Sequence, residues 1–162
     1  NYVIYNYSES LWSVLTFSRG AWEGGSSRQY SLKTTAIDGG NNYLYEQEVG
    51  YDADGEAMTA YIESGDLEIA EGEYLMFMSR IIPDFTFNGN QSDAEANIII
   101  KGSDFPLETA TTLSTSVVTS SSTQSFVRNR ARHSVVRIES SGLGYGWRLG
   151  DLRFDMQPDG RR

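Results

Sequence analysis

The stretch Ser125–Arg162, which reads SFVRNRARHSVVRIESSGLGYGWRLGDLRFDMQPDGRR, decides the fold that we expect for this chain. Two runs rich in β-forming residues, Phe126–Glu139 and Gly146–Met156, flank a linker of serines and glycines that is typical of turns. Within the second run the phase of the apolar residues changes at Gly150, as expected for a β-bulge. The stretch therefore predicts a C-terminal β-hairpin.

Arginine recurs at every second position in the first of these runs. Because side chains alternate between the two faces of a strand, Arg128, Arg130 and Arg132 share a face with Val136. Three guanidinium groups cannot all lie in an apolar core. We therefore expect a hairpin whose base is packed and whose first arm extends beyond the sheet and presents the arginines.

The composition excludes several classes of site. The chain has 162 residues, of which 39% are hydrophobic, enough for one ordinary domain or two small units. It contains no cysteine and one histidine, which excludes disulfides, thiolate chemistry, zinc sites built on cysteine and sites that need several histidines. Signal-peptide architecture and an apolar run of roughly 20 residues, the length that crosses a bilayer, are both absent from the sequence. The composition predicts no metal, no cofactor and no membrane anchor.

The net charge of −9 is unevenly distributed along the chain. Residues 1–126 carry a net charge of −13, whereas residues 127–162 carry +4. A nucleic-acid-binding protein needs a broad positive surface, so this distribution argues against that class. An acidic body with a basic end suits head-to-tail assembly of copies, although two sets of solvated surface charges explain the distribution equally well.

Residues 1–57 alternate short strand-like runs with tight turns. The segment Arg19–Gly25, with three glycines, separates the second run from the third. Four short strands at spacings of about ten residues are typical of one blade of a β-propeller or one small antiparallel sheet. The predicted strands are Asn1–Tyr7, Leu11–Ser18, Tyr30–Ile37 and Asn42–Val49.

The fragment YDADGE that begins at Tyr51 carries three alternating carboxylates, those of Asp52, Asp54 and Glu56. This spacing resembles the opening of a calcium-binding loop. The remainder of such a loop is missing, because the residues around Met58 have the pattern of a strand and not of an incoming helix. We therefore favour a plain acidic hairpin turn over a cation site.

From Met58 onward the strands become longer and the turns contain fewer aromatic residues. Residues 58–162 hold about seven strand-like runs and no convincing helix, which is the strand count of an antiparallel β-sandwich. The whole chain is therefore expected to be all-β. The boundary between the blade-like part and the sandwich is placed at Ala57.

Sequence motifs of catalysis are weak. His133 has serines nearby, but no nucleophile-elbow sequence accompanies it. The glycines of Gly142–Gly146 are followed by neither a lysine nor a helix, so they do not form a phosphate-binding loop. The motifs indicate that the chain is not an enzyme.

Two parts of the chain resemble the tail nozzle, or tail hub (stabilisation), proteins of short-tailed bacteriophages. The C-terminal stretch that begins at Arg130 resembles the C-terminal signature of that family; it reads RARHSVVRIESSGLGYGWRLGDLRFDMQPDGRR. Upstream, YNYSESLWSVLTFSRGAWEGG from Tyr5 and LYEQEVGYDADGE from Leu44 resemble the last blade of its propeller. Members are several hundred residues long, so the resemblance implies that this chain, which starts at Asn1 and not at methionine, is the C-terminal portion of a longer protein.

This resemblance implies a structural role in the virion tail. Six copies would form a ring below the head-to-tail adaptor, dock tail fibre, spike or needle proteins, and let genomic DNA pass without specific binding. The particle would assemble in the host cytoplasm, and the family supplies no catalytic residue to assign. The candidate contact between neighbouring subunits joins the arginines at 128, 130 and 132 to the acidic turn at Asp52, Asp54 and Glu56 of the next copy.

Two other functions remain open at this point. A carbohydrate-binding β-sandwich of a phage tail or of a secreted glycan-active protein would use exposed aromatic rings, such as those of Trp22, Tyr43 or Trp147, as sugar platforms. A glycan-degrading enzyme would need a pair of carboxylates in a cleft.

Overall fold

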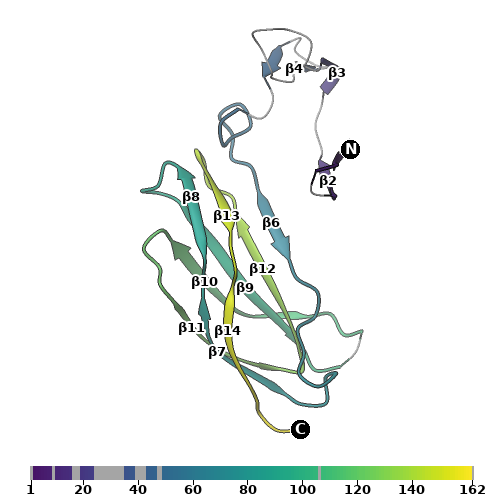
Figure 1. Cartoon of the computed structure of the whole chain (residues 1–162), viewed down its shortest axis with the longest axis vertical. Coiled ribbons are helices and arrows are strands. Elements are labelled where there is room, and N and C mark those ends of the chain that lie inside the picture. Colours follow the sequence, from purple (N-terminus) through teal and green to yellow (C-terminus); the bar gives the residue numbers. More distant parts are fainter. Residues whose placement is uncertain are drawn as a thin grey trace. The chain divides into compact units, whose positions relative to one another are not determined.

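A computed structural model of the chain describes residues 2–8, 10–15, 19–23, 35–38, 43–46, 49–105 and 107–161. The described residues form strands and turns and no helix, which confirms the all-β prediction (Figure 1). The strands of the first 49 residues are β1 (Tyr2–Asn6), β2 (Leu11–Leu15), β3 (Arg19–Glu23), β4 (Thr35–Asp38) and β5 (Leu44–Glu46). The later strands are β6 (Ala60–Glu63), β7 (Met76–Ile82), β8 (Phe85–Gly89), β9 (Glu95–Ser103), β10 (Thr111–Thr119), β11 (Ser125–Ala131), β12 (His133–Ser140), β13 (Tyr145–Leu149) and β14 (Arg153–Pro158).

The chain divides into two compact units, Asn1–Val49 and Gly50–Arg162. In the first unit, β1 and β2 form an antiparallel hairpin, and β3, β4 and β5 form a separate three-stranded antiparallel sheet. The segment Arg19–Glu23, which we expected to be a break between strands, is instead strand β3 and pairs with β4. Ala21 and Trp22 lie opposite Ile37 and Ala36 in the register, so the segment pairs as a strand despite the turn propensity of its glycines.

In the second unit, two antiparallel sheets share one core. The four-stranded sheet has the order β10-β9-β12-β6, and the three-stranded sheet has the order β11-β7-β14. A third pair, β13 with β8, extends the second sheet, because β8 follows β7 and β13 precedes β14 along the chain (Figure 1). This arrangement is compatible with the predicted sandwich.

The long ribbon formed by β7–β8 and β13–β14 is interrupted at one place on each strand. Pro83 ends β7, since proline supplies no N–H for the ladder, and Asp84 follows it. On the facing strand, Gly150 donates its N–H to the Asp84 carbonyl at 2.8 Å. The pairing register changes by one residue between Leu149 and Arg153, so the irregularity predicted at Gly150 lies where the apolar pattern changes phase.

The core of the second unit comes from the inward-facing residues of both sheets. Strand β9 shows the alternation most clearly, with every second residue from Ala96 to Gly102 buried. Gly102 allows the close approach of its neighbours, because a Cβ there would lie 2.5 Å from Leu113 and 2.7 Å from Ala131. The buried cluster comprises Met78, Ile81, Phe87, Ala94, Ala96, Ile98, Ile100, Val118, Val127, Val136, Ile138 and Tyr145.

The division between the units falls after Val49, eight residues before the predicted boundary at Ala57. The reason lies in Tyr51, whose ring covers two glycines of the β8–β13 pair. A Cβ on Gly89 or on Gly146 would approach this ring to 2.8 Å. Only residues without a side chain leave room for such a contact, so the turn around Tyr51 packs with the second unit.

The run Phe126–Glu139 was predicted as a single strand, and this is wrong. The chain leaves β11 of the three-stranded sheet at Arg132 and enters β12 of the four-stranded sheet at His133. The buried positions change parity at this crossing, from Val127, Asn129 and Ala131 to the even-numbered residues of β12. Val136 therefore lies in the core, although residues at the same parity in β11 face outward. The arginine arm does not extend beyond the sheet, because β11 pairs with β7 along its length.

Candidate functional site

The outer face of the three-stranded sheet and its β8–β13 extension carries a group of arginines, which we call the arginine face. On β11 the outward positions alternate with buried Val127 and Asn129, and on β13 and β14 they alternate with residues that pack on the core. Two carboxylates, those of Asp155 and Asp159, pair with this face. The arginines are Arg80, Arg128, Arg130, Arg148 and Arg153.

Two of these arginines are bound within the chain. The Arg80 Nε lies 2.6 Å from Oδ2 of Asp155, and Arg130 Nε lies 2.6 Å from Oδ2 of Asp159. The other three, Arg128, Arg148 and Arg153, are exposed and have no polar partner among the described residues. The face therefore carries three positive charges that are not neutralised within the part of the chain that the structure describes.

Arg132, the third arginine of the predicted arm, has a different role. It is half-buried where the chain crosses between the sheets, and its guanidinium donates to three backbone carbonyls. These carbonyls belong to Gly72 at 2.9 Å, Glu73 at 2.9 Å and Arg161 at 2.6 Å. Arg132 thus joins the loop before β7 to the C-terminal segment.

The acidic turn has the geometry of a two-residue hairpin loop. Ala53 and Glu56 pair as an antiparallel bridge, and the residues between them, Asp54 and Gly55, both have positive φ values, 59° and 81°. This Asp-Gly loop matches a type I′ turn. The Asp52 carboxylate accepts the Gly55 N–H at 2.9 Å, which stabilises the turn from within.

The turn begins a larger acidic stretch, residues 52–73, which we call the acidic segment. It holds eight carboxylates and no lysine or arginine. Three of its carboxylates contact cations or histidine elsewhere in the second unit: Glu63, Glu68 and Glu73. The second unit therefore carries a basic sheet face and an acidic segment, both with exposed side chains.

An ion-pair network crosses three strands on the outer face of the four-stranded sheet. Glu63 on β6 accepts hydrogen bonds from Lys101 at 2.7 Å and from Arg137 at 3.2 Å. Arg137 also donates to Glu139 at 2.7 Å, and its guanidinium lies 3.9 Å over the Tyr61 ring. The pKa of the Glu63 carboxyl lies below its usual range, mainly because of the Lys101 hydrogen bond and then that of Arg137. The pKa of Arg137 is raised, above all by Glu139.

The network predicts a pH-dependent part of the stability. A carboxyl whose pKa is lowered in the folded state stabilises the fold above its unfolded pKa, about 4.3, and loses this contribution as the pH falls. At pH 7 we expect Glu63→Gln to be less stable than wild type by at most about 1 kcal/mol, since the side chain is 35% exposed and screened by solvent. Urea denaturation between pH 7 and pH 3 measures the difference, which should close below the unfolded pKa.

A matched control for this experiment is Glu95→Gln, an exposed carboxylate at the start of β9 for which no ion pair is found among the described residues. A difference between wild type and Glu63→Gln that stayed constant down to pH 3 would contradict the role of the Glu63 charge.

The aromatic residues considered as sugar platforms differ in their surroundings. The half-buried Trp147 ring packs against Phe85, with the centroids 5.8 Å apart, and its Nε1 donates to Ser140 at 2.8 Å, so it belongs to the core boundary. Tyr43 is 62% exposed and meets Tyr45 edge-on at 6.3 Å. The side chain of Trp22 lies outside the described residues.

His133 and the carboxylates form no potential metal-binding cluster in the described part of the chain. The His133 Nδ1 lies 3.1 Å from an oxygen of Glu68, a contact without hydrogen-bond geometry. Within the described ranges, no three residues of the types His, Cys, Asp and Glu come together as a potential metal site. The same ranges contain no helix with the length and apolar character needed to cross a membrane.

Three members of the arginine face were not predicted from the sequence: Arg80, Arg148 and Arg153. Arg153 had a readable signal, since it alternates with Leu152 and Phe154 on a strand whose apolar side chains face inward. Arg80 had none, because the register shifts beside it in both pairings. Against β14 the extra residue is Ser79 of β7, and against β11 the extra residue lies on β11 between Phe126 and Asn129.

A scan against protein-family models finds no family that matches this chain, and a search of curated proteins finds no match.

Proposed function

We propose that the chain is a structural subunit of a ring-shaped tail nozzle or hub of a short-tailed bacteriophage. In this proposal about six copies form a closed ring, extend the channel through which DNA leaves, and dock the head-to-tail adaptor and the fibre, spike or needle proteins. The role is non-enzymatic and belongs to the virion tail. The same proposal assigns the first unit to part of a propeller blade and the second to a β-sandwich.

The observation that carries the proposal is the separation of charge on the second unit. Arg128, Arg148 and Arg153 lie exposed on the arginine face without a described partner. The acidic segment of the same chain supplies the complementary charge. A head-to-tail contact between unlike surfaces generates a ring when its rotation closes, which is the symmetry that a tail hub requires.

The net charge of −9 supports the second part of the proposal, a channel that does not hold DNA. Acidic surfaces repel phosphates, so duplex DNA slides past them without forming the cation contacts that retain it. The arginine face then serves contacts between proteins.

The mass of the native assembly tests this proposal. We expect a species of about six chains that dissociates as the salt concentration rises from about 0.1 M to 1 M, because salt screens exposed ion pairs. The triple variant Arg128→Gln, Arg148→Gln, Arg153→Gln should weaken this species without loss of fold. The variant Asp52→Asn, Asp54→Asn, Glu56→Gln should weaken it similarly, and Glu95→Gln, outside the acidic segment, should not.

Two results would contradict the proposal. One is a chain that stays monomeric at every salt concentration and binds glycans on an array, which would favour the carbohydrate-binding alternative with Tyr43 as a platform. The other is an assembly whose mass is the same in wild type and both charge variants, which would show that the arginine face and the acidic segment do not meet.

A further inference from the structure

One side of the second unit is open between its two sheets. On this side lie β6, at the edge of the four-stranded sheet, and β14, at the edge of the three-stranded sheet. Between them is a groove of about 210 Å³ with apolar walls from both sheets. The residues that line it are Ile62, Glu63, Ser64, Leu67, Val136, Ile138, Leu149, Leu152 and Phe154.

Strand β14 borders this groove and has a free edge. It pairs with β7 on one side and with no described strand on the other, so half of its backbone N–H and C=O groups point away from the sheet. Ser79 of β7 donates to the Asp155 carbonyl at 3.4 Å, which places the backbone of Asp155 toward β7. The backbone groups of Phe154, one residue earlier, therefore face the free edge.

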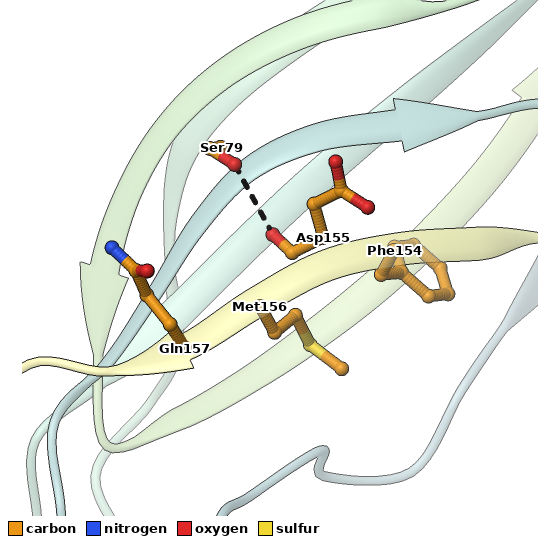
Figure 2. Close-up of a pocket in the computed structure, with 5 residues that line it drawn as sticks. All are labelled: Ser79, Phe154, Asp155, Met156 and Gln157. Atoms are coloured by element: carbon orange, nitrogen blue, oxygen red, sulfur yellow. Dashed lines mark hydrogen bonds between the residues drawn. The ribbon is translucent and has the colours of Figure 1, made fainter.

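The side chains of β14 divide between two faces, as Figure 2 shows. Asp155 and Gln157 lie on one side of the strand, and Phe154 and Met156 lie on the other. Beside the strand is an open hollow of about 300 Å³, lined by these four residues and Ser79. Phe154 packs on the core, while Met156 remains 40% exposed.

The sequence around Phe154 is complementary to itself in antiparallel pairing. When two copies of Leu152-Arg-Phe-Asp-Met156 pair about Phe154, Arg153 of each copy lies opposite Asp155 of the other. Leu152 of each copy then lies opposite Met156 of the other, and the two Phe154 residues face each other. Apolar residues meet on the groove side, and opposite charges meet on the outer side.

The charges on this edge are available for such pairing. Arg153 is exposed and has no polar partner in the described part of the chain. Of the two carboxylate oxygens of Asp155, Arg80 contacts Oδ2, through its Nε and one terminal nitrogen. The other oxygen, Oδ1, has no described partner. The Oδ1 atom can accept a hydrogen bond from Arg153 of a second copy while the contact with Arg80 remains.

We infer that β14 is a self-association edge that pairs antiparallel with β14 of a second copy about a two-fold axis at Phe154. The two three-stranded sheets then become one continuous sheet, and the second copy covers the apolar groove side of the edge. This inference does not rest on the proposed ring, since a ring closes through unlike surfaces and a two-fold contact joins like ones. If both contacts exist, rings pair into assemblies of twice the size; if only this one exists, the chain forms dimers.

Charge-reversed variants of the full chain, measured by sedimentation velocity over a range of concentrations, test the pairing. Arg153→Asp and Asp155→Arg each place like charges opposite one another, and each should weaken the two-fold contact roughly tenfold or more. An equimolar mixture of the two variants places every aspartate opposite an arginine, so it should restore the association as a mixed pair. Glu95→Arg, a charge reversal at the start of β9 in the other sheet and outside the acidic segment, should leave the two-fold contact unchanged.

A cysteine variant keeps the test valid if Asp155→Arg folds poorly through loss of the Arg80 contact. The chain has no cysteine, so Phe154→Cys introduces the only thiol, and two such residues opposed across the axis are within disulfide range. Oxidation should give a disulfide-linked pair, and Arg128→Cys should not. A wild-type chain without any two-fold species, a mixture that stays unpaired, or equal cross-linking of the two cysteine variants would overturn the inference.

Discussion

Replacement of Ile100 by alanine is expected to lower the free energy of unfolding by about 2–5 kcal/mol. Ile100 has no exposed surface, lies at the middle of β9 and faces Val136 of β12 in the register of the four-stranded sheet. Its side chain belongs to the cluster that joins this sheet to the three-stranded one. The lost methyl groups leave a cavity that the tightly packed neighbours fill only in part. Urea denaturation followed by circular dichroism measures the change.

Ile99→Ala is the matched control, because it removes the same atoms from the adjacent residue on the opposite face of β9. Ile99 is half-buried on the outer side of the sheet, beside Arg137 of β12. We expect a loss of roughly 1 kcal/mol or less from it, since its apolar surface is already partly in water. Equal losses from the two variants would contradict a core between the two sheets.

The strands of the second unit follow closely from the sequence, because the apolar alternation and the turn residues agree. The apolar-centred run of β9 and the β-forming run of β10 are each bounded by polar residues in the sequence. The break at Pro83 and the irregularity at Gly150 both rest on local backbone chemistry, the missing proline N–H and the freedom of glycine. Such signals are carried by single residues and can be read without the fold.

The crossing at Arg132 is different, because nothing local marks it. Residues 126–139 are uniformly β-forming, and the change of sheet depends on which strands already occupy each layer. Arg128 and Arg130 therefore face outward from β11, as expected. The expectation that they share a face with Val136 was wrong, because Val136 is buried in β12. The intramolecular partners of Arg130 and Arg132 also lie between 29 and 60 residues away in the sequence. Contacts of that range come from tertiary structure and not from strand periodicity.

The candidate binding surfaces could also be predicted from the sequence only in part. The uneven charge was visible in the sequence, and the turn at Asp54-Gly55 matches its Asp-Gly chemistry. The division of roles among the arginines was not visible, because all three occupy alternate positions in one run. Only the structure separates Arg128, which is exposed, from Arg132, which holds backbone carbonyls.

The different roles of Arg132 and Arg128 predict different losses of stability when each is replaced by glutamine. Arg132→Gln should lower the free energy of unfolding by roughly 2–3 kcal/mol, because a charge-assisted bond contributes about 1.5–3 kcal/mol and three carbonyl contacts are lost from a half-buried site. Arg128→Gln should change it by no more than about 0.5 kcal/mol, as expected for an exposed residue without a described partner. Arg132→Lys should fall between them, since lysine keeps the charge but lacks the planar fork that reaches several acceptors at once.

A local measurement separates the loss of these bonds from a general loss of stability. Leu75 makes two backbone hydrogen bonds that hold the C-terminal segment. Its N–H donates to the Gly160 carbonyl at 2.8 Å, and its carbonyl accepts the Asp159 N–H at 2.7 Å. In Arg132→Gln, hydrogen exchange at these two amides should accelerate more than at the amides of β9, because the loop and the terminal segment open without unfolding of the core. Uniform acceleration across the second unit, or a denaturation curve for Arg132→Gln that overlays that of Arg128→Gln, would show that Arg132 does not join these segments.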